Sequence, residues 1–171
     1  MYHTGLMFGL LCGLLAGFLV LAVLFKKKIL SMEFDERQEL ARGKAFQYSF
    51  LTLMICLFLY AASEMALGRW CDAFAGVMIC IALSITVFAV TCILKDAYLS
   101  LREKPRTIMT MFALLSALNL GIGGTYLFHG GLVEDGILTF RVTNLIAGLM
   151  CLAVLIVYIV NFLLRDRGEG E

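Results

Sequence analysis

Five apolar stretches, each close to the roughly 20 residues that cross a bilayer core as a helix, run through this 171-residue chain. Uninterrupted stretches of this length satisfy their backbone hydrogen bonds in lipid as helices, whereas barrel strands alternate over shorter segments. Hydrophobic residues make up 61% of the chain, which exceeds the ~45–50% of soluble domains. The sequence therefore predicts an all-α integral membrane protein, a single domain built as a bundle of five transmembrane helices. The expected spans are residues 5–25, 46–67, 74–94, 108–128 and 144–164, with a loop at 26–45.

Most lysines and arginines lie in every second segment between these spans, which places them on one side of the membrane. Of the 14 basic residues, only Arg69 and Arg141 follow the second and fourth spans. Basic residues in short loops stay on the cytoplasmic side, so we expect the N-terminus outside and the C-terminus in the cytoplasm. The remaining basic residues follow the first, third and fifth spans: Lys26, Lys27, Lys28, Arg37, Arg42, Lys44, Lys95, Arg102, Lys104, Arg106, Arg165 and Arg167.

Glycine recurs at every fourth position of the first span, at Gly5, Gly9, Gly13 and Gly17. Each step of four drifts only ~40° around a helix axis, so the four glycines share one side of the helix. Small residues on one side let another helix approach closely. We predict that these glycines pack against a neighbouring span of the same chain, with homo-oligomerisation and a pore-lining role as alternatives.

The fourth span has an irregular spot where Asn119 is followed by Gly121, Gly123 and Gly124. We expect the glycines to loosen the helix and the amide to hydrogen-bond a backbone group or a neighbouring helix; a substrate contact is the alternative. The middle of each span lacks Asp, Glu, Lys, Arg and His. Because such residues in a membrane usually carry function, their absence argues against a proton-coupled pump or a voltage sensor.

Catalytic signatures are missing from the sequence. It contains neither a G-x-S-x-G nucleophile elbow nor an H-E-x-x-H metal helix. It also has no C-x-x-C pair, and its His, Asp and Glu residues on the expected outer side match no metal-ligand spacing. We therefore expect no enzymatic activity, no cofactor, no metal and no nucleic-acid partner.

The most distinctive polar segment leads into the second span. Asp35 followed three residues later by Gln38 has the form of a capping box, which predicts the start of a helix. Acidic and basic side chains are mixed here, which suits a protein surface better than a purely lipid-binding patch; a solvated helix extension is the alternative. The residues that we expect to bind a partner are Asp35, Glu36, Arg37, Gln38 and Arg42.

The same segment carries a resemblance. Phe34-Asp35-Glu36-Arg37-Gln38, followed by Arg42-Gly43-Lys44-Ala45-Phe46 at the opening of an apolar helix, resembles a motif of small multi-pass bacterial membrane proteins of the uncharacterised, domain-of-unknown-function type. The resemblance covers this segment and not the other spans. It implies a bacterial plasma (cell) membrane, and it supplies no activity and no catalytic residues.

These features favour a non-enzymatic accessory, regulatory or immunity-type protein that is surrounded by membrane lipids and contacts a membrane or cytoplasmic protein. The alternative is a small oligomeric transporter or channel, with Asn119 and the first-span glycines near its path. For the connections, we expect the third helix to continue through Arg102 and Pro105 to open the fourth. The loop at 129–143 could form either a short helix or a hairpin.

Overall fold

The computed structural model describes residues 34–99 and 104–168, with side chains up to Leu164, and a few residues of the first span. The chain divides into two compact units, Met1–Glu33 and Phe34–Glu171. In the first unit, residues 12, 13, 15–17, 19 and 23 are described, and all are helical. Gly13 and Gly17 are therefore helical, whereas Gly5, Gly9 and the loop residues 26–33 lie outside the described residues. The packing role of these glycines stays a prediction.

Helices dominate the second unit. In chain order they are α2 (Glu36–Leu67), α3 (Ala73–Leu94), α4 (Pro105–His129) and α5 (Val142–Gly168). Two short antiparallel strands, β1 (Val133–Glu134) and β2 (Ile137–Leu138), separate α4 from α5. All four helices are long and apolar enough to cross a membrane, α5 as far as Leu164. The described part of the chain is thus all-helical apart from the two short strands, with four helices that could span a membrane.

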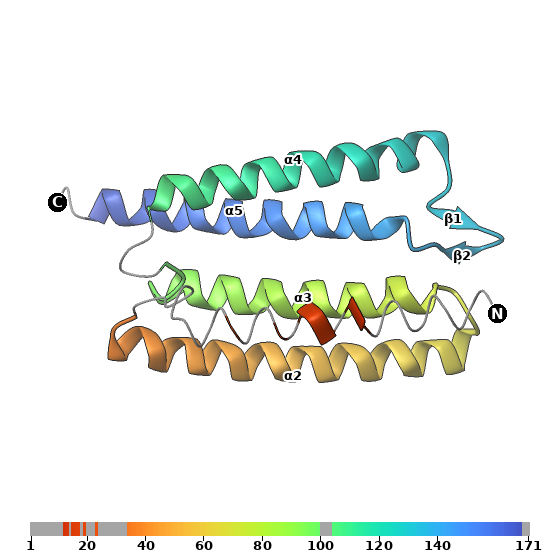
Figure 1. The fold of residues 1–171 in the computed structure, drawn as a ribbon, viewed down its shortest axis with the longest axis horizontal. Helices are drawn as coiled ribbons and strands as arrows, with labels where there is room; N and C mark the ends of the chain where they lie inside the picture. Colours follow the sequence, from red (N-terminus) through yellow and green to blue (C-terminus); the bar gives the residue numbers. More distant parts are fainter. Residues whose placement is uncertain are drawn as a thin grey trace. The chain divides into compact units, whose positions relative to one another are not determined.

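The four helices lie side by side in the order α4, α5, α3, α2 (Figure 1). Neighbours in this row pack against each other: α4 on α5, α5 on α3, and α3 on α2. The helix axes run between two ends of this row. The starts of α2 and α4 and the ends of α3 and α5 lie together at one of them, here called the basic end. The hairpin end carries β1 and β2. This order settles which of the described spans are neighbours, which sequence alone left open.

The interior of the row is built from small side chains. The buried residues of α3 are, with one exception, alanine, glycine, cysteine or serine: Ala75, Gly76, Cys80, Ala82, Ser84, Ala89, Cys92 and Ile93. Large apolar side chains face outward instead, for example Phe58 of α2, which is 74% exposed. Bulky residues outside and small residues between helices are the arrangement of helices that pack in lipid.

At the basic end, α3 stops earlier than expected. It ends at Leu94, and Asp96 adopts a left-handed conformation with φ 52°. The Ala97 N–H donates to the Cys92 carbonyl at 2.8 Å, and the Asp96 N–H donates to the Ile93 carbonyl at 3.1 Å. These two bonds form a Schellman motif, which terminates a helix. The expected continuation of the third helix through Arg102 is therefore wrong, whereas Pro105 does open α4.

At the hairpin end, the loop at 129–143 is a hairpin and not a helix. Asp135 and Gly136 connect β1 to β2, both with positive φ, as a type I′ turn requires. The hairpin also meets the α2–α3 connection, because the Asp72 N–H donates to the Leu138 carbonyl at 2.7 Å and the Leu138 N–H donates to the Trp70 carbonyl at 2.9 Å. This backbone pairing connects the α4–α5 pair to the α2–α3 pair.

Candidate functional site

The polar segment that contains the predicted capping box leads into the first turns of α2. The carboxylate of Asp35 accepts a hydrogen bond from the Gln38 N–H at 2.6 Å, and the Asp35 N–H donates to Gln38 Oε1 at 3.2 Å. The predicted capping box is confirmed. It fixes the first residue of the helix and thereby decides which side chains of the segment face the row and which face away.

Gln38 faces the row. Its side chain is 8% exposed, and its Nε2 donates to the carbonyls of Asp96 at 2.8 Å and Leu99 at 3.4 Å. Both acceptors belong to the connection that follows α3, where helix termination leaves carbonyls without intrahelical donors. Gln38 thus satisfies backbone groups about 60 residues away in sequence, and in doing so it attaches α2 to the end of α3.

Arg42 follows one turn later on the same side of α2. Its Nη1 donates to the Ala97 carbonyl at 3.1 Å. Its guanidinium lies 4.1 Å from the centre of the Phe34 ring and 5.5 Å from that of Phe88, within reach of a cation–π interaction. Together with the fully buried Ala45, Gln38 and Arg42 form what we call the inner α2 face. Its polar groups are occupied by contacts within the chain.

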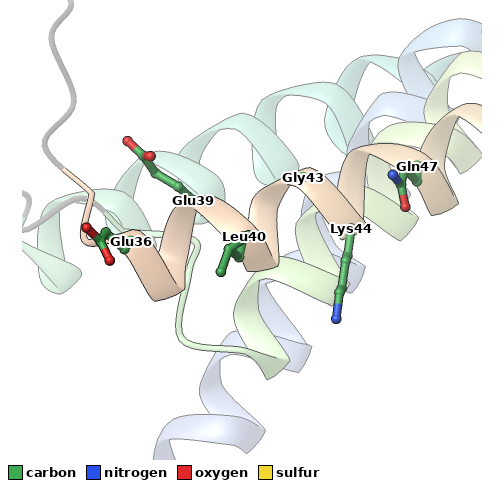
Figure 2. A pocket seen from close by; sticks show the side chains of 6 residues that line it. All are labelled: Glu36, Glu39, Leu40, Gly43, Lys44 and Gln47. Carbon is green, nitrogen blue, oxygen red and sulfur yellow. The ribbon is translucent and has the colours of Figure 1, made fainter.

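Among the residues that the structure describes, none covers the opposite side of the same turns. Its members recur at three- and four-residue spacings along α2, and they line a surface groove of about 600 Å³: Glu36, Glu39, Leu40, Gly43, Lys44 and Gln47. We call this set the outer α2 face. Figure 2 shows that all six lie along one helix, with the two carboxylates toward its start and Lys44 further on. Leu40, between them, is 71% exposed.

The residues predicted to bind a partner are therefore divided between two sides. Asp35 forms the cap, and Gln38 and Arg42 belong to the inner α2 face. Glu36 lies on the outer α2 face, and Arg37 is exposed beside it. Leu40, Gly43 and Gln47 of the outer α2 face were not singled out from the sequence. The three- and four-residue spacing from Glu36 could have identified them once the helix start was known.

A second cavity, of about 310 Å³, lies at the basic end between the start of α2, the α3–α4 connection and the last turns of α5. Sequence reasoning did not find this cavity, because its residues come from segments far apart in the chain. The Nδ2 of Asn161 donates to the Ile93 carbonyl at 3.2 Å and joins α5 to α3 there. The cavity is lined by the polar Gln38, Asp96 and Asn161, the aromatic Tyr98, Tyr158 and Phe162, and the apolar Ile93, Leu99 and Pro105.

Asn119 is partly buried in α4, and its Nδ2 donates to the Leu115 carbonyl of the same helix at 2.8 Å. Of the two interactions expected for this amide, the structure thus has the bond to a backbone group. The glycines that follow do not interrupt α4, which runs continuously to His129. Gly123 instead lies against Leu145 of α5. The glycines are thus compatible with a continuous α4, and the expected loosening of the helix is not observed.

Polar side chains at the hairpin end are engaged with one another. Arg141 pairs with Glu134 and donates to the Gly131 carbonyl at 3.4 Å. Cys71 is fully buried, and this burial, with the nearby carboxylates of Asp72 and Glu64, raises the pKa of its thiol. A raised pKa makes a thiol a poorer nucleophile at neutral pH. Within the described part of the chain, no three His, Cys, Asp or Glu residues come together as a metal site would require.

Comparisons of the chain with protein-family models, with curated proteins and with solved structures gave no match. The fold is a helical bundle whose described part has four apolar helices that could cross a membrane. The two features available for function are the outer α2 face and the cavity at the basic end.

Proposed function

We propose that the protein is a multi-pass protein of the bacterial plasma membrane that acts without catalysis, as an accessory or regulatory protein, by binding another protein through the outer α2 face. In this proposal the basic end lies in the cytoplasm and the hairpin end outside. The distribution of basic residues supports this orientation, because Arg69 and Arg141 are the only basic residues of the described part that lie toward the hairpin end.

The length of α2 supports a role for its first turns outside the membrane. Its 32 residues extend for about 48 Å at ~1.5 Å per residue, whereas the hydrocarbon core is only ~30 Å thick. The charged residues at 36–44 precede a stretch, residues 45–63, with no charged side chain. We therefore place residues 36–47 beyond the hydrocarbon, where the outer α2 face meets the cytoplasm.

The observation that carries the proposal is the division of one helical segment into an occupied face and an open one. Gln38 and Arg42 account for the attachment of α2 to its own chain. They do not account for Leu40, which is 71% exposed beside charged residues. We infer that a partner covers Leu40, with the charged residues around it as the polar rim of the interface.

The charges and the shape of the outer α2 face favour an amphipathic helix as the partner. Basic residues of that helix would lie opposite Glu36 and Glu39, and an acidic residue opposite Lys44, because complementary charges fix the register of an interface. Gly43 has no heavy atom within 4 Å of the position that a Cβ would take, so a partner helix can approach closely there. We propose that a cytoplasmic or juxtamembrane helix of this pattern lies along the outer α2 face.

The test is photo-crosslinking in cells from an unnatural amino acid at position 40, followed by purification in native-lipid particles and mass spectrometry of the linked peptide. We expect one partner, linked through an amphipathic helix with the stated charge pattern. Lys44→Glu should abolish the link. The matched control is Arg106→Glu, the same reversal on an exposed residue of α4 at the basic end, which should leave the link intact.

A linked peptide without this pattern, or equal linking in both variants, would overturn the proposal. Recovery of a bare homo-oligomer would also contradict it and would favour a channel or transporter instead. The internal hydrogen bond of Asn119 gives that alternative no support, and we do not propose it.

A further inference from the structure

The exposed side of α2 does not end with the charged residues of its first turns. α2 is one unbroken helix from Glu36 to Leu67, and exposed positions continue beyond Gln47 at the same three- and four-residue spacing. We call this continuation the α2 stripe: Phe50, Met54, Phe58, Ala61 and Met65. At 3.6 residues per turn these positions, together with Leu40, Gly43 and Gln47, fall within an arc of about 80° around the helix axis. The outer α2 face and the α2 stripe therefore lie on the same side of one helix.

The other side of α2 is used by its own chain. Ser84 Oγ donates to the Ser49 carbonyl at 2.9 Å, and the ring of Tyr60 lies against Gly76 of α3. Ser49 and Tyr60 are about half a turn away from the α2 stripe. α2 also lies at one edge of the row of four helices, next to α3 (Figure 1). Its apolar window has no buried residue, whereas those of α3, α4 and α5 each have some. Among the described residues, the α2 stripe is thus an uncovered surface.

The side chains of the α2 stripe are of the kinds found in contacts between proteins. Phe58 is 74% exposed and Met65 is 90% exposed, and aromatic residues and methionine are enriched in protein interfaces. Ala61, like Gly43, is small, which lets another helix approach closely. Lipid alone would account for apolar side chains in the membrane, but it does not cover Leu40, which the proposed function places beyond the hydrocarbon. A helix that lies along the whole line accounts for both.

The geometry of helix packing leads from the first turns of α2 into the membrane. Helices that pack side by side in membranes cross at about 20°, so a helix that lies along residues 36–47 and points toward the membrane stays next to α2 over the following turns. We propose that the partner is itself an integral membrane protein, and that one of its transmembrane helices continues into the cytoplasm and lies along α2 from Glu36 to Met65. This inference rests on the proposed function and specifies the class of partner.

The test extends the photo-crosslinking of the full-length protein in cells to positions 54 and 58, with position 40 measured in parallel. We expect the partner that is linked from position 40 to be linked from 54 and 58 as well, through residues of an apolar span. Because two packed helices advance equally per residue, the residues linked from 54 and 58 should lie about 14 and 18 residues from the one linked from position 40. With two positions in the α2 stripe, the test does not depend on the folding of a single variant.

The matched control is position 59. Leu59 is 59% exposed and follows Phe58 directly, but it lies about 100° further around the helix, so it should give no link to this partner. If position 40 links the partner whereas 54 and 58 link only lipid, a second copy or another part of this chain, the transmembrane partner is overturned and the proposed function stands. Equal linking from 58 and 59 would also overturn it. No link from position 40 would contradict the proposed function, and this inference with it.

Discussion

The two outer helix pairs of the row are held together in different ways. Between α4 and α5, glycines bring the two helices into direct backbone contact. A Cβ on Gly123 would lie 2.8 Å from the Leu145 nitrogen, and one on Gly148 would lie 2.8 Å from the Leu120 nitrogen. Ser116 adds a hydrogen bond from its Oγ to the Gly148 carbonyl at 3.0 Å. The contact is close because these positions have no side chain.

Between α2 and α3, polar side chains make the main specific contacts. Ser84 Oγ lies 2.8 Å from Ser49 Oγ and donates to the Ser49 carbonyl at 2.9 Å, and Gln38 and Arg42 bond the connection beyond α3. The close approach at Gly76 is to the ring of Tyr60, a side chain that can move. The α4–α5 pair thus depends on close backbone packing, and the α2–α3 pair depends on hydrogen bonds. This difference predicts that substitutions will affect the stability of the two pairs differently.

The largest effect is expected from Gly123→Leu or Gly148→Leu. Each places a side chain where the backbone of the other helix lies, so α4 and α5 must separate. We expect destabilisation by about 3 kcal/mol or more, or loss of the folded protein. Fluorescence of the single tryptophan, Trp70, during denaturation in detergent would measure it, with circular dichroism as a second probe.

The control for this prediction is Gly121→Leu. Gly121 lies two residues away on α4, and a Cβ there would have no heavy atom within 4 Å. Equal destabilisation by Gly121→Leu and Gly123→Leu would mean that backbone contact does not hold the α4–α5 pair.

A smaller effect is expected from Gln38→Ala. The substitution removes two hydrogen bonds to the connection after α3 and one to the Asp35 N–H. Leaving these buried or partly buried groups unpaired should cost about 1–3 kcal/mol. Arg37→Ala, the exposed neighbouring position, should stay within about 0.5 kcal/mol of the wild type. If the two variants unfold alike, Gln38 does not attach α2 to the end of α3.

Ser84→Ala should be milder still. Hydrogen bonds between membrane helices contribute about 0.6 kcal/mol on average, and Ser49 can turn to its own helix when its partner is lost. Thr52→Ala is the matched control, since Thr52 bonds only the Tyr48 carbonyl of the same helix in this structure. A loss as large as that of Gly123→Leu would remove the distinction between the two pairs.

The smallest effect is expected for the reactivity of the Cys71 thiol, which lies where the α2–α3 connection meets the hairpin. Because burial raises the pKa of the Cys71 thiol, its thiolate fraction at any given pH is below that of an ordinary thiol with a pKa near ~8.5. In a variant that keeps Cys71 alone, maleimide labelling should therefore accelerate only at higher pH than in the denatured protein. Superimposable pH profiles would show that Cys71 is not shielded in solution.

Sequence reasoning placed the helices well and their contacts poorly. The expected spans 46–67, 74–94, 108–128 and 144–164 fall within or at the edges of α2, α3, α4 and α5, because hydropathy depends only on neighbouring residues. The capping box at Asp35 was also readable, since both of its residues lie within one turn. Local patterns predicted local structure.

Contacts between helices depend on which helices are neighbours, and the residues of a single span do not reveal this order. The acceptors of Gln38 lie beyond α3, so its inward direction could not be read from its own segment. The early end of α3 depends on the conformation of Asp96, which a run of apolar and charged residues does not reveal. The hairpin had a signal in Asp135-Gly136 between apolar residues, but the same sequence was compatible with a short surface helix.

The small-residue interior of the row has a consequence for how this protein can vary. In a water-soluble helical protein, the bulky core residues are the ones that resist replacement. Here the outward leucines, isoleucines and phenylalanines can exchange for one another, because lipid adapts to any of their shapes. The residues that must keep their volume are Gly123, Gly148, Ala75, Ala89 and Cys92. Tolerance to mutation should therefore be greatest at the large apolar side chains that face outward, and least at the small side chains between the helices.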